Sequence, residues 1–216
     1  MHFQKRVTKI SFYLIIIFFS LNLNAQETTY HYPEKDLIIN QDYYLFGNDV
    51  KFRTEPNTSS KTIVLLAIGT KVKVLEKTIH TLSYNGYNSS FYKVKHNNQT
   101  GFILKGLLAL EKKKVNNYTF YFNFKKKDEE YNIEIRAVNQ KNDIQETSSK
   151  LENAFISLEA YNNKGLPNLE SILFISYTAE ACGENGGGIY FFKQNNTFKK
   201  VFEVEQISDS GVFYNV

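Results

Sequence analysis

The sequence predicts a mainly β protein, and three observations support this fold class. Aromatic residues make up 15% of the 216 residues, all of them Tyr or Phe, and Val, Ile and Thr are frequent. Apolar and polar residues alternate with a period of two in several segments, such as Lys71-Val72-Lys73-Val74. Short turn sequences such as Gly69-Thr70 separate these segments. The pattern indicates short antiparallel strands joined by tight turns.

The first 25 residues have the layout of a secretory signal peptide. Lys5, Arg6 and Lys9 form a basic start, residues 10–21 are an apolar run of twelve, and Ala25 offers a cleavage position before residue 26. The run is shorter than the roughly 20 apolar residues of a membrane span. We therefore expect an exported protein, periplasmic or secreted, with no stable membrane span after cleavage. An uncleaved signal anchor is the alternative, because Leu23 fits the small-residue position before the cut poorly.

Charge is unevenly distributed along the chain. The whole chain is +4, but residues 1–25 carry three basic and no acidic residues, so the chain without them is +1. This excludes nucleic-acid binding through a strong basic field. Residues 47–110 hold nine basic and three acidic residues, whereas residues 26–46 hold one basic and four acidic. The basic region favours an anionic partner; a solvated surface that keeps a small module soluble is the alternative.

The domain organisation follows from these shifts in pattern. Four parts are predicted: 1–25 as signal peptide, 26–46 as a lead-in segment with one short strand at 37–39, 47–110 as a small β-barrel, and 111–216 as a separate C-terminal antiparallel β domain. Within the last part we expect a hairpin of 118–125 with 131–138, a helix or strand at 150–160, a buried strand at 169–177, a hairpin of 188–193 with 198–205, and pairing of 212–214 into the sheet.

Four motifs in the barrel region carry a family resemblance. They are DVKFRTEP at 49–56, AIGTKVKVL at 67–75, FYKVK at 91–95 and NQTGFI at 98–103. Together they resemble the bacterial SH3 domain family (SH3b, SH3-like). The resemblance implies a small β-barrel that binds a ligand; family members often accompany cell-wall hydrolases and help to target them to peptidoglycan. Phe replaces the family's two Trp, Asn98 replaces a turn Gly, and the 76–90 segment is longer.

The resemblance also implies a groove between loops lined with aromatic side chains. Aromatic faces stack on sugars and peptides, while Arg53, together with Lys93 and Lys95, would meet carboxylates. A structural role in the core is the alternative for Phe91 and Phe102. The predicted ligand-binding residues are Arg53, Tyr84, Tyr87, Phe91, Tyr92 and Phe102.

No catalytic motif is evident in the sequence. The Gly-rich stretch at 180–188 is followed by a predicted strand and lacks a closing Lys-Ser/Thr, which excludes a nucleotide-binding loop.

The single cysteine, Cys182, excludes an intramolecular disulfide. A nucleophilic cysteine needs a base, and the remaining histidines His31, His80 and His96 all lie in the first half. A free thiol or an intermolecular disulfide is therefore expected.

The sequence predicts no metal site and no cofactor. It contains no HExxH, CxxC or EF-hand spacing. Residues 162–198, with NNKGLPNL at 162–169, have a weak likeness to one FG-GAP/VCBS-type propeller repeat. The Asp ligands of such loops are Asn or Lys here, so calcium binding is not expected, and one blade cannot form a propeller.

These inferences predict an exported, non-catalytic binding protein whose barrel contacts cell-wall peptide or another envelope component. One alternative is a protein-interaction or inhibitor role of the C-terminal domain through exposed strand edges. The second is a hydrolase with a site near Cys182, or at Glu180 and Glu184. The sequence leaves the oligomeric state open.

Overall fold

The fold is mainly β, as predicted. In the computed structural model, residues 28–178, 185–195, 197–209 and 212–215 are described. They form three antiparallel sheets and one short 3₁₀-helix, η1 (Lys105–Leu107). The predicted signal peptide and Cys182 lie outside the described residues. No helix of the described part is long and apolar enough to cross a membrane.

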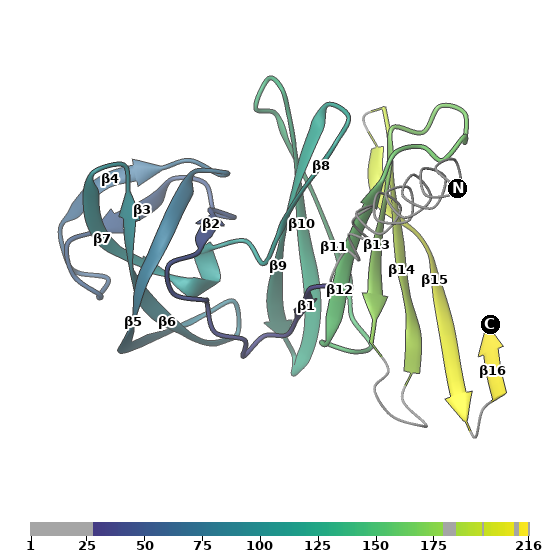
Figure 1. The fold of residues 1–216 in the computed structure, drawn as a ribbon, viewed down its shortest axis with the longest axis horizontal. Coiled ribbons are helices and arrows are strands. Elements are labelled where there is room, and N and C mark those ends of the chain that lie inside the picture. The colour runs from purple at the N-terminus through teal and green to yellow at the C-terminus, as the bar shows by residue number, and fades with distance from the viewer. Residues whose placement is uncertain (1–27, 179–184, 196, 210–211, 216) are drawn as a thin grey trace, which may run out of the picture.

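The first sheet, called the barrel below, lies at the left of Figure 1 and curls around its own core. Its strand order is β2-β5-β6-β7-β3-β4. Inward-facing apolar side chains such as Phe52, Val74 and Val94 are fully buried, while their lysine neighbours point outward, as the period-two pattern requires. The strands are β2 (Asp42–Tyr44), β3 (Val50–Arg53), β4 (Thr62–Leu66), β5 (Lys71–Tyr84), β6 (Tyr87–His96) and β7 (Gln99–Leu104).

The other two sheets pack face to face and share one core, so together they are called the sandwich. The second sheet has the order β11-β10-β9-β8 and the third β1-β12-β13-β14-β15-β16. Phe122, Phe124 and Ile135 of the second sheet are fully buried in the same cluster as Leu173 and Phe191 of the third. The second sheet contains β8 (Lys112–Val115), β9 (Tyr118–Lys127), β10 (Glu130–Asn139) and β11 (Ile144–Lys150). The third contains β1 (Tyr30–His31), β12 (Ile156–Tyr161), β13 (Ser171–Tyr177), β14 (Asn185–Gln194), β15 (Thr197–Asp209) and β16 (Val212–Asn215).

Most of the predicted strands of the sandwich are confirmed. The hairpins β9–β10 and β14–β15 and the pairing of β16 with β15 are present. The ambiguous stretch at 150–160 is not helical: β11 ends and β12 begins within it. In the loop likened to a calcium loop, the side-chain oxygens of Asn162 and Asn163 accept from the backbone N–H groups of Lys164 (3.1 Å) and Gly165 (3.2 Å). These side chains therefore stabilise the turn itself.

The lead-in segment differs from its prediction, and it connects barrel and sandwich. The strand predicted at 37–39 is wrong: β1 lies earlier and β2 later in the chain. β1 pairs with β12 at one edge of the third sheet, and β2 pairs with β5 at one edge of the barrel. Figure 1 shows the dark purple segment running from one to the other. The segment has two separate strands because it completes two different sheets.

A second connection is the tip of the long β5–β6 hairpin, which packs on β9. The backbone N–H of Lys126 donates to the carbonyl oxygen of Asn85 (2.7 Å), and the Asn85 side-chain amide donates to the carbonyl of Phe124 (3.3 Å). Gly86 has a φ of +81°, and a Cβ there would lie 2.0 Å from the Lys126 carbonyl oxygen. Only glycine allows this approach. The barrel and the sandwich are therefore in direct backbone contact.

Candidate functional site

Two of the six predicted ligand-binding residues are buried on opposite faces of β6, and only Tyr92 belongs to the barrel core. Phe91 and Tyr92 on β6 are buried, with 4% and 0% of their surface exposed. The Tyr92 hydroxyl donates to Asp36 Oδ1 (3.0 Å) and accepts from the Leu37 N–H (3.3 Å). Burial raises the pKa of Tyr92 well above its ordinary value. In this structure neither ring offers a face to a ligand, and Tyr92 instead holds the lead-in segment on the barrel.

Two further predicted residues lie where the hairpin tip meets the sandwich. Tyr84 ends β5 and packs against Gly106, where a Cβ would lie 2.7 Å from the Tyr84 ring. Tyr87 begins β6 and packs on the sandwich core beside Tyr131, and its burial raises its pKa to about 12. The longer 76–90 segment therefore contributes its aromatic side chains to the contact between barrel and sandwich.

The remaining two predicted residues lie side by side on the outer face of the barrel. Arg53 on β3 is directly opposite Phe102 on β7, and Phe102 is directly opposite Lys93 on β6. All three side chains are half-buried, and Arg53 Nη1 donates to the Ser60 carbonyl (2.9 Å). Directly opposite residues share a face of a sheet. The result is a row of cation, aromatic ring and cation across three strands.

More lysines extend the positive charge of this face. Lys95 is opposite Lys73 across β5 and β6, and Lys51 precedes Arg53 by two positions on β3. Within the described residues, Lys51, Lys93 and Lys95 make no ion pair with a carboxylate. We name the set of outward-pointing side chains Lys51, Arg53, Lys93, Lys95 and Phe102 the basic face.

Acidic residues of the lead-in segment pair with three further lysines of the barrel. Asp42 lies 3.1 Å from Lys71 Nζ and 3.5 Å from Lys73 Nζ, and Asp36 lies 2.7 Å from Lys77 Nζ. Hydrogen bonds from Lys77 and Lys71 hold the pKa values of Asp36 and Asp42 below their usual range. Part of the charge of the barrel is thus neutralised within the molecule, whereas the lysines of the basic face form no ion pair in the described part, although Glu76 lies opposite Lys93 on β5.

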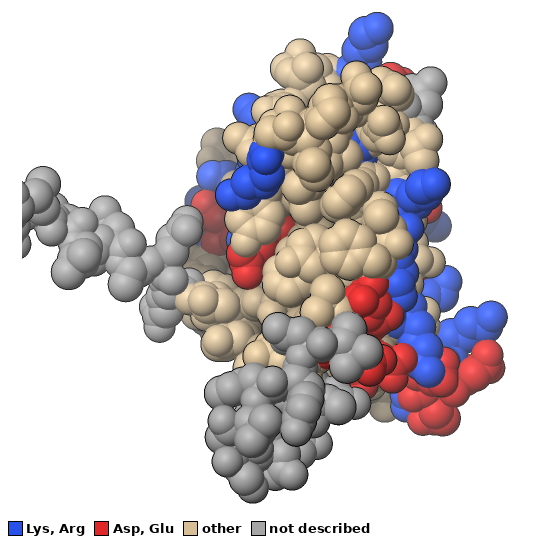
Figure 2. Space-filling view, turned by 90° about the vertical axis from the view of Figure 1, so that its right-hand side faces the viewer, with Lys and Arg blue, Asp and Glu red and all other residues tan. Residues whose placement is uncertain are grey.

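The sandwich presents a different outer surface, made of aromatic rings. Phe174, Tyr190 and Phe202 stack across β13, β14 and β15 with ring centroids 4.3 and 4.6 Å apart. Phe192 meets Phe202 edge-on at 6.1 Å, and Phe202 is 45% exposed. We name these four residues the aromatic stripe. Figure 2 shows this side of the molecule, where uncharged side chains form a continuous area with charged groups around it.

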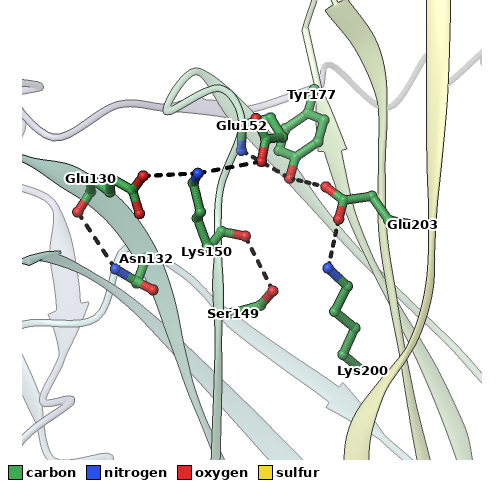
Figure 3. A network of polar contacts seen from close by, with 8 residues as sticks. All are labelled: Glu130, Asn132, Ser149, Lys150, Glu152, Tyr177, Lys200 and Glu203. Atoms are coloured by element: carbon green, nitrogen blue, oxygen red, sulfur yellow. Dashed lines mark hydrogen bonds and ion pairs between the residues drawn. The ribbon is translucent and has the colours of Figure 1, made fainter.

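A polar network joins the two sheets of the sandwich at one end (Figure 3). Lys150 Nζ lies 2.9 Å from Glu130 and 3.8 Å from Glu152, while the Tyr177 hydroxyl donates to Glu203 (2.8 Å) and accepts from the Glu152 N–H (3.2 Å). Lys200 in turn donates to Glu203 (2.6 Å). Each carboxylate has a cation nearby, so the network acts as a structural link between sheets. In the described part of the chain, no group of three or more His, Cys, Asp or Glu is placed to hold a metal ion.

The comparisons with known proteins agree with the barrel motifs. Residues 48–109 match the family described as bacterial SH3 domain. No curated protein and no solved structure matches the chain. The resemblance predicted from the sequence is therefore confirmed for this region, and a bacterial SH3 domain indicates a binding role.

Sequence reasoning recognised Arg53, Lys93 and Lys95 of the basic face but missed Lys51, and it did not foresee how the aromatic candidates divide. Phe91, Tyr92 and Phe102 lie close together in sequence, yet Phe91 and Tyr92 are buried and only Phe102 is half-buried. The strand register gives a usable signal: Phe102 falls between the inward-facing Gly101 and Ile103. The tight fit of Gly101, where a Cβ would lie 2.6 Å from the Phe52 ring, fixes this register.

Proposed function

We propose that this protein is an exported binding protein that contacts anionic cell-wall peptide through the basic face of its barrel, and that it acts by binding rather than catalysis. The observation that carries the proposal is the row of Arg53, Phe102 and Lys93 on adjacent strands. The apolar run at residues 10–21 and the basic residues before it support export.

The chemistry of the row suits a peptide that carries carboxylates. Arg binds a carboxylate with two parallel hydrogen bonds. Lys carries its positive charge on a flexible stem, so its ammonium group can reach a second carboxylate of the same peptide. Phe102 between them offers an apolar surface for the peptide backbone or a small side chain. Wall peptides that contain free carboxylates at short spacing fit such a row, and the binding should weaken with salt.

Co-sedimentation of residues 26–216 with purified peptidoglycan sacculi tests this proposal. We expect binding at low salt that weakens at moderate salt, and a loss of about tenfold or more in the double variant Arg53→Gln/Lys93→Gln, since each removes a charge-assisted contact. Lys141→Gln is the matched control, because Lys141 lies in the β10–β11 turn of the sandwich. Equal binding of all three proteins, or no binding at low salt, would contradict the proposal.

A second candidate function, self-assembly through the C-terminal region, is favoured by the aromatic stripe. Monomeric proteins rarely expose such contiguous apolar areas without a use. Glu159 lies opposite Phe174 on one side of the stripe and Lys199 opposite Phe192 on the other. A second copy related by a two-fold axis along the strands would bring Glu159 of one copy over Lys199 of the other.

Light scattering with size-exclusion chromatography tests this second candidate. A mass that rises toward a dimer with concentration, and stays monomeric in Tyr190→Ser/Phe202→Ser, would support it. Leu65→Ser is the control, because Leu65 is an exposed apolar residue on the barrel (53%). A monomeric mass at all concentrations would exclude it.

A further inference from the structure

A cavity of about 310 Å³ lies where the lead-in segment, the barrel and the second sheet meet. Its walls come from all three parts: lead-in residues on one side, residues 105–112 on another, and the start of β6 and the middle of β9 on the third. The apolar part of the wall combines aliphatic residues, such as Leu37 and Leu108, with five aromatic ones: Tyr32, Tyr43, Tyr44, Tyr87 and Phe124. Cavities at the junction of two structural units are common ligand sites, and this volume is at the small end of their range.

The carboxylates that line this cavity already have cationic partners. Asp36 pairs with Lys77, Asp42 with Lys71 and Lys73, and Glu111 with Lys113 at 2.5 Å. None of these lysines belongs to the cavity wall. His31, which does line the cavity, lies 3.1 Å from Glu111. The acidic groups are therefore directed toward the protein and not toward a ligand.

The lysines that line the cavity have no such partners. Lys35 and Lys105 donate to the backbone carbonyls of Tyr30 and Pro33, the second at 2.7 Å, and Lys112 lies 3.7 Å above the Tyr44 ring. Within the described residues, none of these three ammonium groups is within ion-pair distance of a carboxylate. An ammonium group has three donors, so Lys105 has two more to offer. Burial also lowers the pKa of Lys105, an effect that the charges of Asp36 and Glu34 offset only in part.

We infer that this cavity is a second ligand site, which takes a small organic anion with an apolar body: a carboxylate of about dipeptide size. The three lysines provide the positive charge for the head, and the aromatic walls provide contact for the body. A singly charged carboxylate fits better than a phosphate, because a doubly charged head costs more to remove from water between aromatic walls. The site is distinct from the basic face, since Arg53, Lys93 and Phe102 do not line the cavity.

Two carboxylates of different origin serve as probes in a calorimetric titration of residues 26–216. One is N-acetyl-alanyl-phenylalanine, a peptide C-terminus, and the other is 3-phenylpropionate, a free acid. Binding of the peptide alone would identify the ligand as a chain end, and binding of the free acid alone as a small metabolite-like acid. If neither binds at millimolar concentration, the inference is wrong.

Two comparisons show whether the charge of the head matters at this site. The C-terminal amide of the same dipeptide should bind wild-type protein at least about tenfold more weakly, and this test needs no variant. Lys105→Met keeps the apolar stem of the side chain and should weaken binding of the carboxylate by a similar factor, whereas Lys141→Met in the β10–β11 turn should not. Equal binding of amide and acid would overturn the inference.

Lys105→Met should leave sedimentation with sacculi unchanged. The proposal of a cavity site can therefore be disproved without disproving the proposed function of the basic face.

Discussion

The barrel and the sandwich are built from the same antiparallel hairpins but present opposite kinds of outer surface. The aromatic rings of the barrel are buried or half-buried and its outer face presents lysine and arginine, whereas the sandwich leaves a stack of aromatic rings on its outer face. The aromatic residues that family resemblance suggests as ligand contacts are thus largely structural. Residue type alone therefore does not locate a binding surface, because strand register and neighbouring elements decide which ring is exposed to solvent.

The barrel and the sandwich are held together at the tip of the β5–β6 hairpin, and Gly86→Ala should have the largest effect on this contact. A Cβ at this position would overlap the Lys126 carbonyl and would also strain a left-handed backbone. We expect a loss of about 3 kcal/mol in the free energy of unfolding. Urea unfolding followed by fluorescence and far-UV circular dichroism measures it.

Gly165→Ala is the control for that variant. Gly165 is also left-handed, with a φ of +85°, but no atom lies within 4 Å of a Cβ built there. Backbone strain alone should cost about 1 kcal/mol. Equal losses in the two variants would mean that the contact between hairpin and sandwich contributes little.

The next largest effect concerns the lead-in segment, which holds the two regions from the other side. Tyr92→Phe removes the hydrogen bonds to Asp36 and from Leu37, and we expect a loss of about 1.5 kcal/mol in unfolding free energy. Tyr43→Phe removes a single bond, from the Ile38 N–H (2.8 Å), in a more exposed place, so its loss should be smaller. A neutral Tyr92→Phe variant, measured by urea unfolding, would contradict the role given to this hydroxyl.

The two kinds of outer surface can be compared directly by removing one ring from each. Phe102→Ala should weaken binding to sacculi by about fivefold, which is about 1 kcal/mol of stacking and burial. Phe202→Ala on the aromatic stripe should leave that binding unchanged. The reverse result would assign wall binding to the sandwich and leave the basic face without a role.

The smallest expected effect is a pH dependence at the edge of the sandwich. Burial works to raise the pKa of Glu111, but hydrogen bonds from His31 and Lys113 outweigh it, so the pKa lies below its ordinary value. A carboxyl group with a lowered pKa stabilises the fold above its ordinary value near 4.5 and loses that contribution as the pH falls through the folded value.

Urea midpoints between pH 7 and pH 3 measure this contribution. Glu111→Gln should be less stable than wild type at pH 7, and the difference should shrink below pH 4 to within about 0.5 kcal/mol. Glu205→Gln, an exposed residue, should follow the wild-type curve. A constant difference across the whole range would show that the Glu111 pairing does not depend on its charge.

Much of the fold could be predicted because strand periodicity is a local property. The hairpins β9–β10 and β14–β15 are visible as alternating apolar segments around Asn- or Lys-rich turns, and the barrel motifs are close together in sequence. The strand pairs of the lead-in segment were not predictable in this way: Tyr30 pairs with Ser157 and Tyr43 with Val72, and nothing local specifies such distant partners. Only the excess acidic charge of the segment signalled a basic neighbour.

The candidate site was predictable only in part, for a related reason. Arg53 and Phe102 become neighbours through the pairing of β3 with β7, which the family motifs imply but do not spell out. Tyr84 and Tyr87 are drawn to the sandwich by contacts with β9, a strand outside the family's boundaries. The cavity at the junction depends on three separate parts of the chain, so no single motif could indicate it.

Mapping where soluble wall peptides bind tests most directly whether the basic face is the surface that contacts the cell wall. Isotope-labelled protein of residues 26–216 would be titrated with muropeptides that carry free carboxylates, and backbone amide shifts would be followed by NMR. We expect the shifts to be concentrated at residues 51–53, 93–95 and 100–102, and to be lost in Arg53→Gln/Lys93→Gln. Shifts confined to β13, β14 and β15, or no shifts at millimolar peptide, would contradict it.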